Sequence, residues 1–245
     1  MGSRALPPGG AEPRVTGTVL SCPSPNHGPR RDGARPDLIV LHHTAMTSAE
    51  AALERLCDPA AEVSAHYLVS ERGVIWGMMP EELRAWHAGT GRWGRVSDVN
   101  SHSIGIELAN TGVHPYPAPQ IAALRSLMAG IMARWSIPPA RVIAHSDMAP
   151  ARKSDPGPRF DWRGLARDGL SVWSDAAGEG VNWGAFLRDA GRFGYAIGDN
   201  APETVLGAFR LRFRPHASGP LDGTDCARMA DLAARFPVDR MPPSA

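Results

Sequence analysis

The sequence predicts a layered α/β or α+β domain followed by a small bundle of three helices. Up to about residue 175, short apolar runs such as 38–41 alternate with longer segments of helical spacing such as 119–135, a pattern typical of strands and helices packed in layers. From about residue 183 onward only helical spacing recurs. Glycine (26) and proline (23) make up a fifth of the 245 residues, which indicates long loops between these elements.

The chain divides into three predicted parts. Residues 1–36 are rich in proline, glycine and arginine and predict an irregular N-terminal arm. Residues 37–175 predict the main domain. Residues 181–240 predict a separate helical module, joined by a linker near 175–180, or alternatively a helical appendage that only packs on the main domain. Its three helices are expected at 183–193, 202–213 and 224–236.

In the first half of the main domain, the apolar run Leu38–Leu41 predicts a strand buried on both faces. Thr47 and Glu50 have the spacing of a capping box, which predicts a helix reaching about Cys57. Two further runs predict a hairpin, because they are separated by Glu71-Arg72-Gly73; they span 65–70 and 74–79.

In the second half, residues 103–108 alternate strictly between apolar and other side chains. They predict a strand that turns Ile104 and Ile106 to one face and Glu107 to the other. A helix over 119–135 is ended by two prolines, and a short strand over 141–144 ends at His145.

Composition excludes several classes of protein. The 26 basic and 25 acidic residues give a net charge of +1, and 43% of residues are hydrophobic. A polybasic nucleic-acid binder is therefore not expected. No apolar run approaches the roughly 20 residues of a membrane helix, so we expect no transmembrane segment, and we expect a monomer.

The cysteines and the first residues bear on the compartment. Cys22, Cys57 and Cys226 are widely spaced and odd in number, which predicts free thiols. Val19–Cys22 has the form of a lipoprotein cleavage box, but no hydrophobic stretch precedes it. The expected compartment is the cytoplasm, with the periplasm as the alternative.

Three side chains have the chemistry of an open metal site. His42 and His145 follow the ends of two predicted strands, where ligands collect in sheet-based domains. Asp155 follows ten residues later, in a loop restricted by Pro156 and Pro158. Two imidazoles and one carboxylate suit Zn²⁺ and leave a coordination position open for water, as in catalytic rather than structural zinc sites.

Two charged residues complete the predicted chemistry. Glu107 faces away from the core side of its strand and is the candidate base for moving a proton from water to a leaving amine. Lys153 is the sole lysine among 26 basic residues and lies two positions before Asp155. Its ammonium group is the candidate for stabilising an oxyanion.

Each residue also has an ordinary interpretation when taken alone. A histidine at a strand end is more often a satisfied core or surface group than a ligand, and Glu107 alone is typical of a salt-bridge partner. Lys153 alone is typical of a solvated charge, and Asp155 before proline is typical of a turn. His43 competes with His42, since neighbouring strand side chains point to opposite faces. The hypothesis depends on the combination.

Six stretches, together with these residues, resemble the zinc-dependent N-acetylmuramoyl-L-alanine amidases of the type-2 (AmpD/AmiD-like) family. They follow one another in order across nearly the whole main domain, and the last is the most specific. They are SPNHGPR (24–30), LIVLHHTA (38–45), AHYLVSERGVIW (65–76), RAWHAG (84–89), NSHSIGIELAN (100–110) and AHSDMAPARKSDPGPRFDW (144–162).

The resemblance implies an enzyme that cleaves the amide between N-acetylmuramic acid and L-alanine in peptidoglycan or muropeptides, in cell-wall turnover or recycling. It implies one zinc ion per chain on His42, His145 and Asp155, with Glu107 as general base and Lys153 stabilising the tetrahedral intermediate. It also implies a mixed β-sheet flanked by helices, which makes residues 37–175 the catalytic domain.

Four further residues lie in matching stretches near the expected cleft and are candidates for shaping substrate binding: His66, Trp86, His87 and Asn100. Residues 181–240 resemble a three-helix peptidoglycan-binding domain, with Gly194-Tyr195, Ala208-Phe209 and Asp222-Gly223 in its typical places.

The alternative function is a non-catalytic peptidoglycan recognition protein, of the kind that has lost zinc. Loss of zinc usually goes with replacement of a ligand, and here both histidines and Asp155 are present. The intact set favours the enzyme. A purely structural zinc fits poorly, because such sites normally have four protein ligands rich in cysteine.

Overall fold

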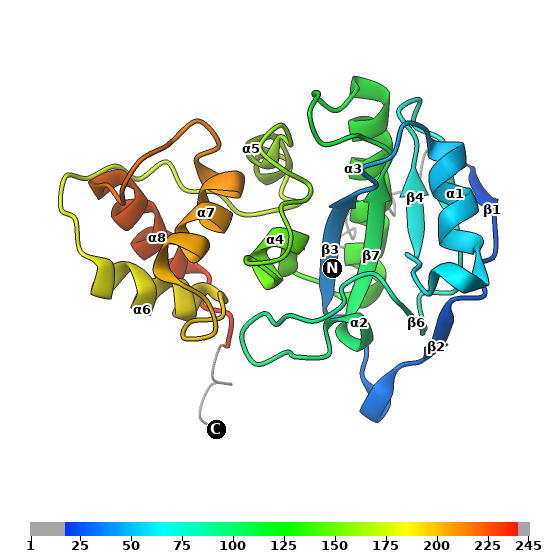
Figure 1. The fold of residues 1–245 in the computed structure, drawn as a ribbon, viewed down its shortest axis with the longest axis horizontal. Helices are drawn as coiled ribbons and strands as arrows, with labels where there is room; N and C mark the ends of the chain where they lie inside the picture. Colours follow the sequence, from blue (N-terminus) through cyan, green and yellow to red (C-terminus); the bar gives the residue numbers. More distant parts are fainter. Residues whose placement is uncertain (1–17, 240–245) are drawn as a thin grey trace, which may run out of the picture.

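A six-stranded mixed sheet forms the centre of the protein in the computed structural model, which describes residues 18–239. Its strand order is β1-β5-β4-β7-β3-β8, and a two-stranded sheet β2-β6 lies beside it (Figure 1). The strands are β1 Val19–Ser21, β2 His27–Pro29, β3 Leu38–His43, β4 Tyr67–Val69, β5 Ile75–Gly77, β6 Leu83–Ala85, β7 Ser103–Leu108 and β8 Val142–Ala144.

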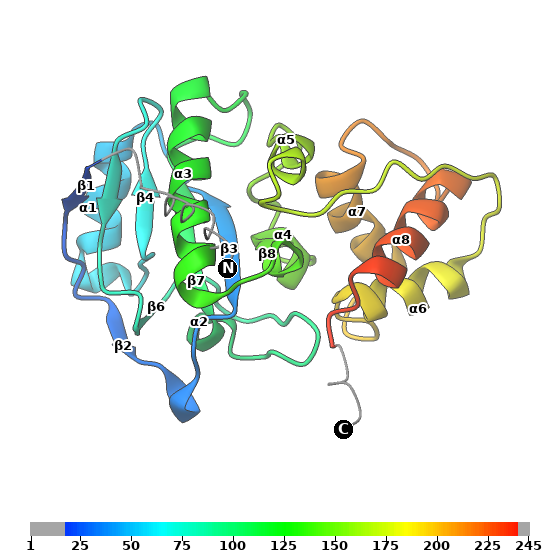
Figure 2. The same ribbon diagram turned by 180° about the vertical axis from the view of Figure 1, so that it is seen from behind.

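Helices cover both faces of the sheet and form the C-terminal part of the chain. Helices α1 and α3 lie on opposite faces of the sheet (Figures 1 and 2). The helices are α1 Ala49–Cys57, α2 Val99–His102, α3 Ala118–Trp135, α4 His145–Met148, α5 Trp162–Arg167, α6 Trp183–Phe193, α7 Pro202–Phe213 and α8 Gly223–Arg235, with short 3-10 turns at Arg31–Gly33, Pro59–Ala61 and Pro139–Arg141.

The predicted mixed α/β architecture is confirmed. Strand β3 pairs in parallel with both β7 and β8, whereas β4 and β5 pair antiparallel as the predicted hairpin. The alternation in β7 places Ile104, Ile106 and Leu108 in one apolar cluster with residues of α3. The opposite face of the sheet, which carries Glu107, is left for the site.

Two local predictions are corrected. Helix α1 begins after Ser48, whose side chain accepts a hydrogen bond from the backbone N–H of Ala51, so the cap is Ser48 and not Thr47. The predicted irregular arm contains strands β1 and β2, which pair with β5 and β6. Each is only three residues long and is defined by a partner more than fifty residues away, so it leaves no local periodicity. Residues 1–17 of that arm lie outside the described residues.

The three predicted C-terminal helices are present as α6, α7 and α8, and they share an apolar core with the main domain. Phe193 and Tyr195 pack edge-on against Trp93, a loop residue of the main domain. The backbone N–H of Gly94 donates to the carbonyl of Gly194 at 2.8 Å. At Gly194, where φ is 145°, a Cβ would collide with the Trp93 ring. The linker therefore joins two parts in intimate contact.

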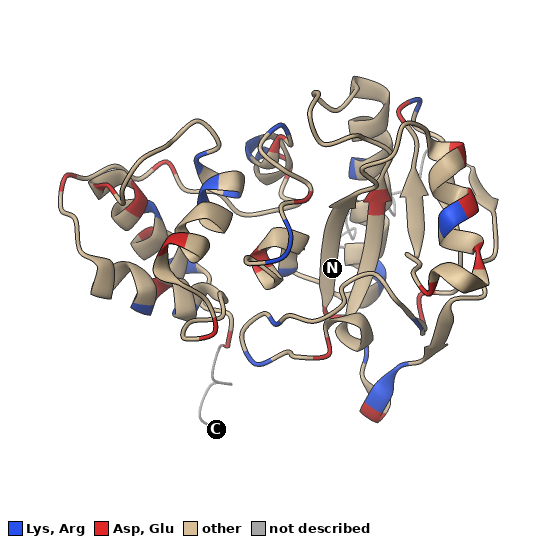
Figure 3. Cartoon of the chain, in the orientation of Figure 1, with Lys and Arg blue, Asp and Glu red and all other residues tan. Residues whose placement is uncertain are grey.

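Charges and thiols agree with the expectations from composition. Basic and acidic residues are intermixed along the described elements rather than gathered by sign (Figure 3). All three cysteines are free thiols, although the sulfur atoms of Cys22 and Cys57 lie 3.6 Å apart. None of the described helices combines the length and the apolar character that crossing a membrane requires.

The shared core leads to a stability prediction. Trp93→Ala should lower the free energy of unfolding by about 3–5 kcal/mol, because it removes a buried aromatic side chain between the two parts. Urea denaturation measures the change. As a control, Val113→Ala at a side chain that is 77% exposed should shift stability by less than about 0.5 kcal/mol. If the two variants were equally stable, the contacts of Trp93 with the C-terminal helices would not contribute to the free energy of unfolding.

Candidate active site

The candidate site is a pocket of about 400 Å³ at the carboxyl ends of β3, β7 and β8. Parallel pairing brings these strand ends to one edge of the sheet, where ligands collect in open α/β sheets. The pocket is lined by the predicted residues His42, Glu107, His145, Lys153 and Asp155, together with residues of α1 and of the loops after β6 and α4.

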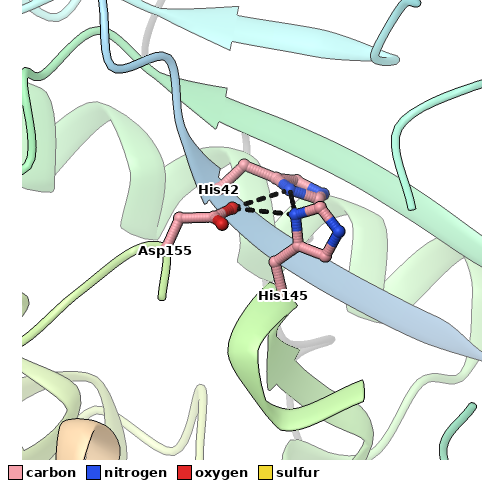
Figure 4. A group of neighbouring side chains, drawn as sticks. All are labelled: His42, His145 and Asp155. Carbon is pink, nitrogen blue, oxygen red and sulfur yellow. Dashed lines mark hydrogen bonds and ion pairs between the residues drawn. The ribbon is translucent and has the colours of Figure 1, made fainter. Parts of the chain in front are cut away.

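Figure 4 shows His42, His145 and Asp155 pointing toward one another from β3, α4 and the loop that follows it. The two Nδ1 atoms lie 2.9 Å apart, and Asp155 Oδ2 lies 3.1 Å from Nδ1 of His42 and 2.9 Å from Nδ1 of His145. All three side chains are buried. The structure thus brings together the three residues that were predicted as ligands.

A hydrogen-bonded chain fixes which nitrogen of His42 carries the proton. The hydroxyl of Ser103 donates to the carbonyl of Val99 at 2.6 Å, so its oxygen accepts from Nε2–H of His87 at 3.1 Å. His87 Nδ1 is then an acceptor, and His42 Nε2–H donates to it at 3.0 Å. In a neutral His42 ring, Nδ1 is left without a proton and faces the pocket.

The other two atoms are also acceptors. His145 donates its Nε2–H to the carbonyl of Ala88 at 2.9 Å, so the Nδ1 of the neutral ring is bare. Asp155 contributes a carboxylate oxygen. Three lone pairs at about 3 Å from one another, with no proton between them, repel unless a cation lies among them. The donor set of two nitrogens and one oxygen fits Zn²⁺, and both imidazoles have the second-shell partners that metal-ligating histidines use.

The protonation states agree with ligand roles. Burial, followed by the neighbouring His145, lowers the pKa of His42 to about 4. Burial also lowers the pKa of His87 well below its ordinary value. Neutral imidazoles and an ionised carboxylate are the forms that bind metal.

Glu107 lies beside His42, since the two residues are partners in the β3–β7 register. Its Oε2 is buried and has no hydrogen-bond partner within residues 18–239. Burial, and then the charge of Asp155, raise its pKa to about 8, while Lys153 acts in the opposite direction. Glu107 lines the pocket, so a carboxylate with an oxygen that lacks a protein partner is a candidate there to bind water or substrate.

Cationic side chains line the same pocket. They are Lys153, Arg152 and Arg55. Arg152 donates through Nη2 to the carbonyls of Ala88 and Thr90, so it also braces the carbonyl that holds His145. Neither Arg152 nor Arg55 was singled out from the sequence, because arginine is the ordinary basic residue of this chain and a lone arginine carries no motif.

The competition between the two adjacent histidines is decided by the faces of β3. His43 turns away from the cluster, and its Nδ1–H donates to the carbonyl of Pro156 at 3.3 Å. Its ring packs against Gly112, where a side chain would collide with it. His42 is therefore the histidine of this pair that joins His145 and Asp155.

The four candidate substrate contacts separate into two groups. Trp86 and His87 line the pocket, and His87 additionally orients His42. His66 and Asn100 do not line it. His66 is fully buried and accepts from the backbone N–H of Gly105, and the Asn100 side-chain oxygen accepts from the backbone N–H groups of His87 and Ala88. Any influence of these two on substrate is indirect.

Sequence reasoning missed the support of the ligands. Ser103 completes the proton chain through His87, and the carbonyl of Ala88 orients His145. At Gly105 a Cβ would lie 2.5 Å from the His87 ring, so a glycine is needed for that ring to approach β7. His87 and Ala88 lie in the RAWHAG stretch (84–89), but the acceptor role of a backbone carbonyl leaves no signal in the sequence.

Comparison with known proteins agrees with this site. The family described as N-acetylmuramoyl-L-alanine amidase matches residues 32–158. The chain is 37% identical to the N-acetylmuramoyl-L-alanine amidase AmiD of Escherichia coli in an alignment of 209 residues that covers 73% of this chain and 75% of AmiD. The chain belongs to the N-acetylmuramoyl-L-alanine amidase family.

Solved structures of relatives extend the likeness over most of this amidase. One is the complex of AmiD from E. coli with the substrate anhydro-N-acetylmuramic acid-L-Ala-D-γ-Glu-L-Lys; it has a TM-score of 0.78 at 33% identity and covers 86% of this chain and 94% of that one. AmpDh3 from Pseudomonas aeruginosa has a TM-score of 0.75 at 31% identity and covers 85% and 95%. The predicted family, fold and enzyme class are confirmed, and the matches favour the enzyme over the non-catalytic alternative.

The unpartnered carboxylate leads to a prediction for the metal-free protein. The folded-state pKa of Glu107, about 8, exceeds the ordinary 4.5, so the fold favours the protonated form and loses stability as pH rises from 4.5 to 8. Glu107→Gln should therefore raise the melting temperature at pH 8, by roughly 2–4 °C per kcal/mol. The gain should shrink toward zero near pH 4.

Calorimetry of chelator-treated protein at the two pH values measures this difference. Glu54→Gln, at an exposed position of α1, is the control and should leave the melting temperature unchanged at both. A Glu107→Gln protein no more stable than wild type at pH 8 would show that the carboxylate is solvated rather than held in a destabilising site.

Proposed function

We propose that this amidase is a zinc enzyme that hydrolyses the bond between the lactyl group of N-acetylmuramic acid and L-alanine of the stem peptide. The observation that carries the proposal is the meeting of three bare acceptor atoms from His42, His145 and Asp155, 2.9–3.1 Å apart. They lie in one pocket with Glu107, whose Oε2 is buried and has no hydrogen-bond partner among the described residues. One zinc ion per chain fits this arrangement.

When bound, Zn²⁺ supplies Lewis-acid chemistry that polarises the scissile carbonyl and makes water more acidic. Glu107 takes the proton of the attacking water and hands it to the nitrogen of the leaving L-alanine. Burial, and then the charge of Asp155, raise the pKa of Glu107, and the second contribution would fall if Asp155 held a cation, which would favour the ionised base. The chain His42–His87–Ser103 keeps the imidazole of His42 in the tautomer that offers Nδ1.

The remaining pocket side chains bind and orient the substrate in this proposal. Lys153 stabilises the oxyanion that develops on the attacked carbonyl, because its ammonium lies in the pocket on a flexible stem. Arg55 and Arg152 offer positive charge to the carboxylates of a stem peptide, and Trp86 offers an apolar wall.

Soluble anhydro-muropeptides are the proposed substrates. Among structural relatives, AmiD is in complex with an anhydro-N-acetylmuramyl peptide, and AmpDh3 is in complex with an anhydromuramic pentapeptide. Residues 37–175 are the proposed catalytic domain, with 181–240 as a peptidoglycan-binding-like module. We further propose a monomer in the cytoplasm, where three unpaired thiols are typical.

Removal of the base tests the mechanism. Glu107→Ala should keep zinc but lose turnover by a factor on the order of 10²–10⁴, the usual size of general acid–base catalysis. Mass spectrometry of peptide released from 1,6-anhydro-muropeptide and from insoluble sacculi, side by side, measures activity and shows which substrate is preferred. Cleavage by the variant at the parental rate would remove Glu107 from the mechanism.

Metal content tests the site itself. Protein loaded with Zn²⁺ and desalted should retain about one ion per chain by elemental analysis. His42→Gln should abolish retention, whereas His43→Gln should keep it, because the adjacent ring donates to the Pro156 carbonyl instead. Sub-stoichiometric metal in wild-type protein that added zinc does not restore would favour the non-catalytic recognition protein.

A further inference from the structure

A buried arginine of the C-terminal helices reaches into the framework of the metal site. Arg212 lies on α7, and its side chain is fully buried. It forms an ion pair of 2.6 Å with Asp147 of α4 and donates to the carbonyl of Val142 on β8 at 2.9 Å. Its guanidinium also stacks over the ring of Trp162, 4.4 Å from the centroid. Helix α7 lies against α4 and α5 in both ribbon views (Figures 1 and 2).

The partner of Arg212 fixes the turn that carries a proposed zinc ligand. Helix α4 is a single turn, His145–Met148, and its first residue is His145. The Asp147 carboxylate accepts from the backbone N–H of Ala144 at 2.9 Å, which closes this turn around His145. Its other oxygen accepts a hydrogen bond of 2.7 Å from the hydroxyl of Tyr195. Tyr195, like Arg212, belongs to the C-terminal part.

The charges explain why this contact is specific. Asp147 and Arg212 are both fully buried, and removal of one partner leaves the other charge buried and unpaired. Asp147 can therefore hold the turn only while Arg212 and Tyr195 satisfy it. Both oxygens of Asp147 are bonded, and buried polar networks of this kind favour a single well-defined arrangement, although Nε of Arg212 has no hydrogen-bond partner among the described residues.

We propose that Arg212 and Tyr195 are positioning residues for the metal site. Acting through Asp147, they hold the backbone of His145 in the place from which its Nδ1 meets His42 and Asp155. The C-terminal helices thus complete the support of the site, in addition to any binding of cell wall. This inference rests on the proposed zinc function, since it assigns a cause to the geometry of one ligand.

The chain provides a matched control on the same helix. Arg210, two residues before Arg212, also forms a buried ion pair, with Asp225 of α8 at 2.5 Å. Its other bonds go to the carbonyls of Gly219 and Pro220, all within the C-terminal part. Loss of Arg210 should disturb the C-terminal helices but leave Asp147 and its turn unchanged, because none of these contacts involves the main domain.

Cobalt binding tests the proposal without reference to activity. Co²⁺ serves as a coloured probe, and its affinity and visible absorption are measured in wild type, Arg212→Met and Arg210→Met, with melting temperatures recorded in parallel. Arg212→Met should bind Co²⁺ about tenfold more weakly, as expected for loss of outer-shell support, and with altered absorption bands. Arg210→Met should bind Co²⁺ with an affinity within twofold of wild type, even if its melting temperature falls as far as that of Arg212→Met.

Two milder variants keep the test decisive if Arg212→Met does not fold. Tyr195→Phe removes one hydrogen bond to Asp147 and should weaken Co²⁺ binding two- to threefold, and Arg212→Lys should restore part of the affinity. Wild-type affinity in Arg212→Met or Tyr195→Phe, or equal losses in the Arg212→Met and Arg210→Met proteins, would overturn the positioning role. Wild-type protein that binds no Co²⁺ would instead overturn the proposed zinc function on which it rests.

Discussion

Three electron-rich atoms lie close together with no proton between them: Nδ1 of His42, Nδ1 of His145 and Oδ2 of Asp155. The rest of the site depends on the electrostatic repulsion between these atoms. The repulsion is not relieved by a proton, because each imidazole uses its N–H in another hydrogen bond: His42 donates to His87, and His145 donates to the carbonyl of Ala88. The proposed Zn²⁺ would resolve it. The site is therefore pre-formed, and the fold, rather than the metal, fixes the direction of each lone pair.

The sheet supplies most of that direction. Parallel pairing of β3 with β7 and β8 brings His42, Glu107 and the start of α4 to the same edge. The face of β7 that carries Ile104 and Ile106 packs on α3, which commits Glu107 to the opposite side. Core packing on one face thus sets the position of the candidate base on the other.

A destabilising feature accompanies the function. Glu107 has a raised pKa and a buried oxygen that has no partner in the described chain, an arrangement that lowers stability near neutral pH and that suits the base of the proposed mechanism. Stability comes from elsewhere, including the aromatic core between Trp93 and the C-terminal helices. The aromatic contacts join the C-terminal helices to the domain that carries the candidate site.

The sequence by itself determined the main strands and helices, the three ligand candidates and Glu107, because periodicity and residue chemistry are local properties that survive without coordinates. Only the tertiary structure decided which of His42 and His43 faces the cluster, which nitrogens are bare, and that β1 and β2 are strands. It also decided that Asp147 forms an ion pair with Arg212 of α7. These features depend on strand register, rotamers and backbone acceptors contributed by residues 45 to 113 positions away, and such long-range contacts leave no pattern in a single sequence.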